Sequence, residues 1–180
     1  GTFTTFLDKG FGFDGEEITV NRTLGFMDCK EDGSNLRLYL ARGMNIGYNS
    51  NFSPVSLYDQ VVEGAGYVPA MPTIGGHRVD LLEKGMMPCW EFYTKWQNKA
   101  MKTLIDQNKY DVVFSHVHNI DICAHVFYRL AIFRKGNPEI EIEKYPALIE
   151  RLYRDTDRYL GEFMEYMDQG YTIMIISDHG

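Results

Sequence analysis

The sequence lacks the features of several protein classes. No apolar run approaches the ~20 residues that a membrane-spanning helix needs. No block of Lys and Arg offsets the formal net charge of −7, which argues against a nucleic-acid partner or an anionic membrane surface. Cysteine is scarce, and Cys29, Cys89 and Cys123 are widely spaced and odd in number. A disulfide framework is therefore not expected, and a reducing, cytoplasmic compartment is favoured.

What remains is the composition of an ordinary globular protein. The chain has 180 residues, of which 44% are hydrophobic and 24% charged, and it contains no internal repeat. This length suffices for one core, or for one core with an appended module. The chain begins at Gly1 without Met and stops directly after an Asp-His-Gly motif, so we expect it to be a fragment.

The first half of the chain is the less regular half. Apolar runs at 24–29 and 36–40 flank a turn-forming cluster at 30–35, which predicts a hairpin. Pro54, at a first helical position, predicts a helix that continues to Val62.

The second half alternates helical stripes with short apolar runs. Apolar residues at helical spacing predict helices over 93–105, 126–133 and 146–170. The runs at 110–116 and 171–177 predict buried strands. Strands separated by helices are typical of an α/β fold with a mostly parallel sheet that helices cover on both faces.

Each predicted strand leads into a carboxylate and an imidazole. Asp121 and His125 lie four residues apart, which on a helical turn places them on one face, about 5–6 Å apart at Cβ. Asp178 and His179 follow the second strand. Because parallel strands present their ligands at their carboxyl ends, we expect the two pairs to converge within ~12 Å. An Asp cap beside an incidental His is the plainer alternative.

These residue types indicate which metals are plausible. Carboxylates and neutral imidazoles suit Zn²⁺ and similar ions, whereas Ca²⁺ and Mg²⁺ prefer shells made of oxygen alone.

Other polar residues near these motifs also have two interpretations. His116 and His118 could line the site or orient its ligands, but satisfied polar residues at a strand end are the plainer expectation. His77 with Arg78 could hold an anion or form an exposed loop pair. Cys123 is expected to be a buried structural thiol.

Three motifs together resemble the alkaline phosphatase superfamily, in particular its type I phosphodiesterase/nucleotide pyrophosphatase branch. They are, in order, Asp121-Ile-Cys-Ala-His125, Asp157-Arg-Tyr-Leu-Gly161 and Ile-Ile-Ser-Asp178-His179-Gly180. The resemblance covers roughly residues 90–180. It implies part of a three-layer α/β/α core over 86–180, with an insert or cap that contains the hairpin over 1–85.

The resemblance implies a hydrolase of small-molecule phosphate esters that uses two divalent ions, Zn²⁺ or alternatively Mn²⁺. Asp121 and His125 would bind one ion, and Asp178 and His179 would bind the other. The Thr or Ser nucleophile of the family matches no residue here. We therefore expect the nucleophile to lie outside this fragment and the fragment alone to be inactive.

Two other functions remain open. Cofactor-independent phosphomutases of the same superfamily resemble this pattern too, usually with Mn²⁺, and residues 75–80 faintly resemble their layout. They carry Ala-Asp-His-Gly-Asn where this chain has Ser177. A metal-free binding module that has kept the fold is the second alternative.

Overall fold

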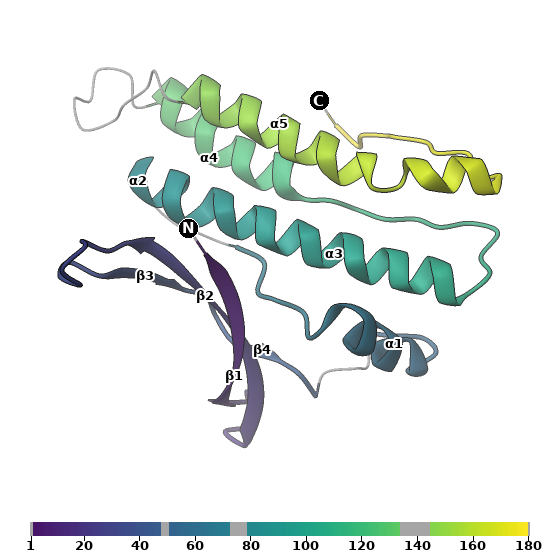
Figure 1. Cartoon of the computed structure of the whole chain (residues 1–180), viewed down its shortest axis with the longest axis horizontal. Coiled ribbons are helices and arrows are strands. Elements are labelled where there is room, and N and C mark those ends of the chain that lie inside the picture. The colour runs from purple at the N-terminus through teal and green to yellow at the C-terminus, as the bar shows by residue number, and fades with distance from the viewer. Residues whose placement is uncertain (1, 48–50, 73–78, 134–144, 180) are drawn as a thin grey trace.

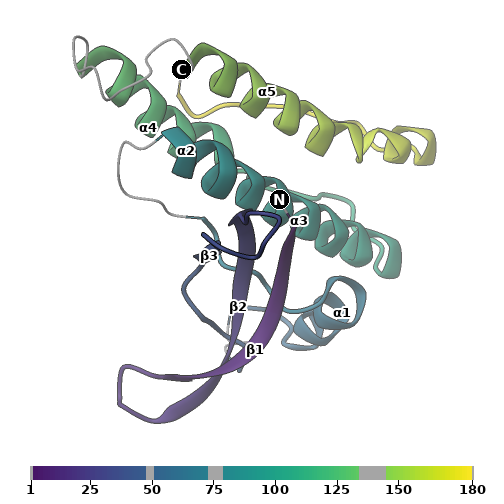
Figure 2. The ribbon, with the colours of Figure 1, turned by 60° about the vertical axis from the view of Figure 1, so that its left-hand side comes forward.

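The computed structural model describes residues 2–47, 51–72, 79–133 and 145–179. An antiparallel sheet occupies the first half of the chain and helices dominate the second, which confirms the α/β class (Figure 1). In Figures 1 and 2 the sheet and the first helix lie on one side of the long central helix α3, and helices α4 and α5 lie on its other side. The proposed boundary near residue 85 stays a prediction.

The sheet is built around one long strand. Its members are β1 (Phe3–Phe11), β2 (Glu17–Asp28), β3 (Arg37–Leu40) and β4 (Met44–Asn45). Strand β2 pairs antiparallel with each of the other three, with Phe3 opposite Gly25 and Leu24 opposite Leu40. The hairpin at 24–40 is therefore confirmed, and Gly33 adopts a φ of 78° in its turn. The sequence pattern does not predict β1.

The helices agree with the predicted ones in place but not in every boundary. They are α1 (Ser56–Ala65), α2 (Val79–Leu81), the π-helical turn η1 (Leu82–Met86), α3 (Met87–Gln107), α4 (Asn119–Phe133), α5 (Tyr145–Gly161) and the 3₁₀ helix η3 (Met164–Gln169). The single helix predicted over 146–170 is wrong, because α5 ends at Gly161 and η3 follows it. Within the described ranges, no helix has the length and apolarity to cross a membrane.

The strands predicted at 110–116 and 171–177 are wrong as strands. Both segments are extended, and in Figure 1 both run from right to left. The Tyr171 hydroxyl donates a hydrogen bond to the Tyr110 carbonyl at 2.8 Å. In the described part of the chain, however, no backbone hydrogen bond joins the two segments, and Val112 and Ile176 are exposed. An apolar run favours a strand, but the strand forms only beside a hydrogen-bonded neighbour.

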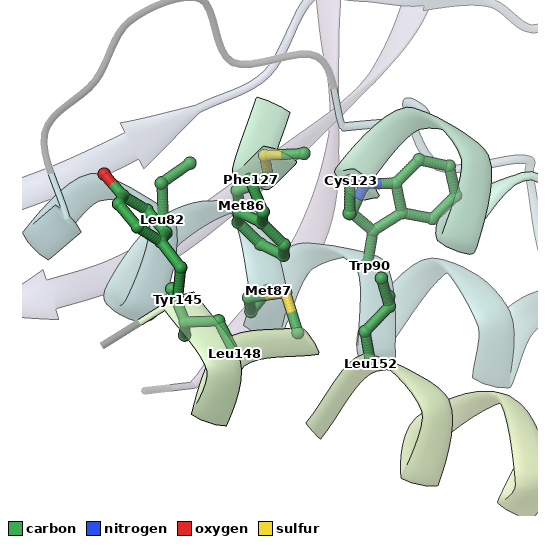
Figure 3. Packing of buried hydrophobic residues seen from close by; sticks show 9 residues of the cluster. All are labelled: Leu82, Met86, Met87, Trp90, Cys123, Phe127, Tyr145, Leu148 and Leu152. Atoms are coloured by element: carbon green, nitrogen blue, oxygen red, sulfur yellow. The ribbon is translucent and has the colours of Figure 1, made fainter. Parts of the chain in front are cut away.

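The main core lies between η1, α3, α4 and α5 (Figure 3). Its buried members are Leu82, Met86, Met87, Trp90, Cys123, Phe127, Tyr145, Leu148 and Leu152. Burying one such aliphatic or aromatic side chain contributes about 1.5–3 kcal/mol to folding. In this core α4 packs against α5 and α5 packs against α3, and α4 carries the first pair of candidate ligands.

Truncation of one core residue tests this packing. Leu152 is 1% exposed, so Leu152→Ala should lower the free energy of unfolding by about 2–5 kcal/mol through lost burial and a cavity. Its neighbour Tyr153 is 58% exposed, and Tyr153→Ala should change the free energy of unfolding by no more than about 0.5 kcal/mol. Urea denaturation measures both values. Equal losses in the two variants would contradict the placement of α5.

Candidate metal-binding site

Side chains of α3 and α5 fix the segment that leads into α4. The Ser115 Oγ lies 3.0 Å from the hydroxyl of Tyr159 on α5. The Gln97 side chain on α3 donates a hydrogen bond to the His116 carbonyl at 2.8 Å. Burial raises the pKa of Tyr159, so that residue is a neutral phenol at neutral pH. The segment is thus fastened to two helices just before the first candidate ligands.

Asn119 secures the start of α4 itself. Its side chain is buried, and its Oδ1 accepts a hydrogen bond from the Ile120 N–H at 2.9 Å. Its Nδ2 donates to the Thr156 Oγ1 on α5 at 2.9 Å, and that hydroxyl donates in turn to the Leu152 carbonyl. Buried polar groups with partners of this kind give a helix one defined position.

One face of α4 packs into the core and the other reaches solvent. Cys123 and Phe127 lie one turn apart and are fully buried in the core. Asp121 and His125, also one turn apart, lie on the other face of the helix and reach solvent. The prediction of Cys123 as a buried thiol is confirmed. Burial raises its pKa to about 12, so the thiol is protonated at neutral pH.

The candidate ligands meet around the carboxylate of Asp121. The Nε2 of His125 lies 3.1 Å from its Oδ1, and the Nε2 of His179 lies 3.6 Å from the same oxygen. The Nε2 of His118 lies 3.0 Å from the other oxygen, Oδ2. The Nε2 of His179 is also 3.8 Å from the Oδ1 of Asp178. The two motifs, distant in sequence, are therefore in contact, well inside the expected ~12 Å.

The cluster is open to solvent. The Asp121 side chain is 28% exposed, whereas the side chains of His125 and Asp178 are 80% and 85% exposed. A small solute can therefore reach the cluster without any rearrangement of the core.

Two further histidines named from the sequence lie at or beside the cluster. His118 contacts Asp121 directly, which agrees with the interpretation that it lines the site or orients its ligands rather than with the plainer expectation of a polar residue at a strand end. Its i, i+3 spacing to Asp121 across the start of α4 was the available signal. The ring of His116 lies against that of His118, with centroids 4.5 Å apart and ring planes tilted by 56°. His77 and Arg78 lie outside the described residues.

The donor types in the cluster are those that a divalent ion such as Zn²⁺ prefers, and the spacing of one pair suits such an ion. Two donors that share a tetrahedral Zn²⁺ at about 2.0–2.1 Å lie ~3.3 Å apart, close to the 3.1 Å between Asp121 and His125. Three imidazoles and two carboxylates match the nitrogen and oxygen preference of such ions. In the described ranges, no three or more His, Cys, Asp or Glu side chains are grouped so that they could hold an ion together.

Comparison with known proteins adds a family match. Residues 52–180 match the family model of type I phosphodiesterase / nucleotide pyrophosphatase. The matched region begins just before α1 and includes every candidate ligand around Asp121. No curated protein and no solved structure matches the chain.

The fastening of α4 can be tested apart from any ligand. Asn119→Ala leaves the buried Thr156 hydroxyl without its donor and removes the side chain that bonds the Ile120 N–H. We expect the free energy of unfolding to fall by about 1–3 kcal/mol. Thr156→Ser, which keeps the acceptor oxygen, serves as the matched control and should lose less. Chemical denaturation compares the two, and an Asn119→Ala variant as stable as the unsubstituted protein would refute this fastening.

Proposed function

Because the chain belongs to the type I phosphodiesterase/nucleotide pyrophosphatase family, a family of phosphoric ester hydrolases, we propose that it is a metal-dependent hydrolase of small-molecule phosphate esters. The observation that carries the proposal is the contact between the two Asp-His pairs. The His179 Nε2 lies 3.6 Å from the Asp121 Oδ1, although the motifs are far apart in sequence. Functional groups brought together from separate segments at an exposed surface are what a substrate site requires.

Each pair would hold one divalent ion. Asp121 and His125 would bind the first and Asp178 and His179 the second, with Zn²⁺ as the preferred ion and Mn²⁺ as the alternative. Such ions, when bound, lower the pKa of a nucleophilic hydroxyl and stabilise the charge on phosphate oxygens.

The protein's own groups then have defined roles. The carboxylates of Asp121 and Asp178 offset positive charge, and the imidazoles of His125 and His179 supply neutral nitrogen donors. None of these four residues serves as a general base. We assign no residue of this chain as the nucleophile.

The substrate class follows from charge and access. The cluster is exposed, so a compact phosphate ester can approach it, while a net charge of −7 disfavours a polyanionic nucleic acid. The family match supports a hydrolase over the phosphomutase alternative. The phosphomutase-like stretch at 75–80 falls mostly outside the described residues and supports neither the hydrolase nor the phosphomutase.

A substitution of Asp178 tests the proposal. Asp178→Asn removes a ligand charge while nearly preserving volume, so turnover should fall by on the order of 10²–10³-fold or more. The assay uses bis-p-nitrophenyl phosphate with saturating Zn²⁺ or Mn²⁺, on protein expressed from its complete reading frame. The melting temperature in chelator should stay level or rise, because a repelling carboxylate has been removed.

The exposed Asp168 offers a matched control. Asp168→Asn makes the same chemical change away from the cluster and should leave turnover and melting temperature unaltered. If Asp178→Asn instead kept its turnover and melted at a lower temperature, Asp178 would be a structural cap and the proposal would lose its support.

A further inference from the structure

His118 stands in a different relation to Asp121 from that of the other two imidazoles. It contacts Oδ2, with its Nε2 at 3.0 Å, whereas His125 and His179 both contact Oδ1. We propose that His118 is a positioning residue, which holds one carboxylate oxygen of Asp121 so that the other faces the remaining candidate ligands. This inference rests on the proposed function and deepens it.

The need for such a residue follows from the chemistry of the carboxylate. The terminal torsion of an Asp side chain is broad, so the carboxylate turns easily and can present either oxygen. The His118 Nε2, 3.0 Å from Oδ2, would restrict this freedom by donating to that oxygen, while Oδ1 lies 3.1 Å from the His125 Nε2. Carboxylates that bind metals are generally held by hydrogen bonds of this kind, and loss of the partner weakens metal binding.

His118 is itself well anchored. Its carbonyl accepts a hydrogen bond from the Ile122 N–H at 3.2 Å, which ties its backbone to the first turn of α4. Its ring lies against the ring of His116, whose carbonyl is fastened to Gln97 on α3. The buried Asn119 follows directly. The backbone of His118 is therefore fixed, and little side-chain freedom is lost when the imidazole contacts Oδ2.

The geometry separates this role from that of a direct ligand. His118 contacts Oδ2 of the carboxylate, whereas the other two imidazoles contact Oδ1. A hydrogen bond to Asp121 requires a donor at the Nε2 position, whereas a metal bond requires an imidazole lone pair. A glutamine can supply a hydrogen-bond donor there, but it is a poor substitute for an imidazole as a metal ligand.

The test is zinc affinity, measured by titration calorimetry with Zn²⁺ alone on the unsubstituted protein and its variants. His118→Ala removes the donor and should raise the zinc dissociation constant about 10–100-fold. His118→Gln places an amide N–H near the former Nε2 and should recover most of the affinity. Melting temperatures in chelator check that both variants fold, and the Gln variant keeps the test valid if Ala does not.

Each outcome has one meaning. A Gln variant that binds zinc as weakly as the Ala variant would make His118 a direct ligand and overturn the positioning role. An Ala variant with unchanged affinity would show that His118 has no role at the site, while the proposed function stands. If Asp121→Asn leaves zinc binding unchanged, or the unsubstituted protein binds none, the proposed function fails and this inference fails with it.

Discussion

The packing of one face of α4 into the core is the constraint on which the site depends. Cys123 and Phe127 are buried against α3 and α5, and this burial sets the rotation of the helix about its axis. Since α4 can turn only with loss of that burial, its other face must carry Asp121 and His125 to the surface. The buried Asn119–Thr156 hydrogen bond adds a polar contact that defines where the helix begins.

This arrangement separates stability from chemistry. The residues that hold the helices together are apolar and buried, whereas the candidate ligands are polar and exposed. Substitutions at the ligands can therefore change metal binding with little effect on the core. The second Asp-His pair reaches the same place at the end of an extended segment, where His179 contacts Asp121.

Sequence reasoning located the helices and the candidate ligands because both depend on local spacing. Apolar periodicity predicted α3, and the four-residue interval predicted that Asp121 and His125 share a face. The strands predicted at 110–116 and 171–177 do not form, because a strand needs a hydrogen-bonded partner whose identity is not encoded in the apolar run itself. His118 was undervalued because its contact arises only when the chain turns into α4.

The central claim is that Asp121 is the carboxylate around which a divalent ion binds. Anomalous X-ray scattering at the zinc edge, from crystals of the protein soaked in Zn²⁺, locates bound zinc directly. The account predicts a zinc ion about 2.0–2.2 Å from an Asp121 oxygen, with the His125 imidazole as a second ligand. Zinc bound only at other residues, with the Asp121 carboxylate still in contact with its imidazoles, would contradict it.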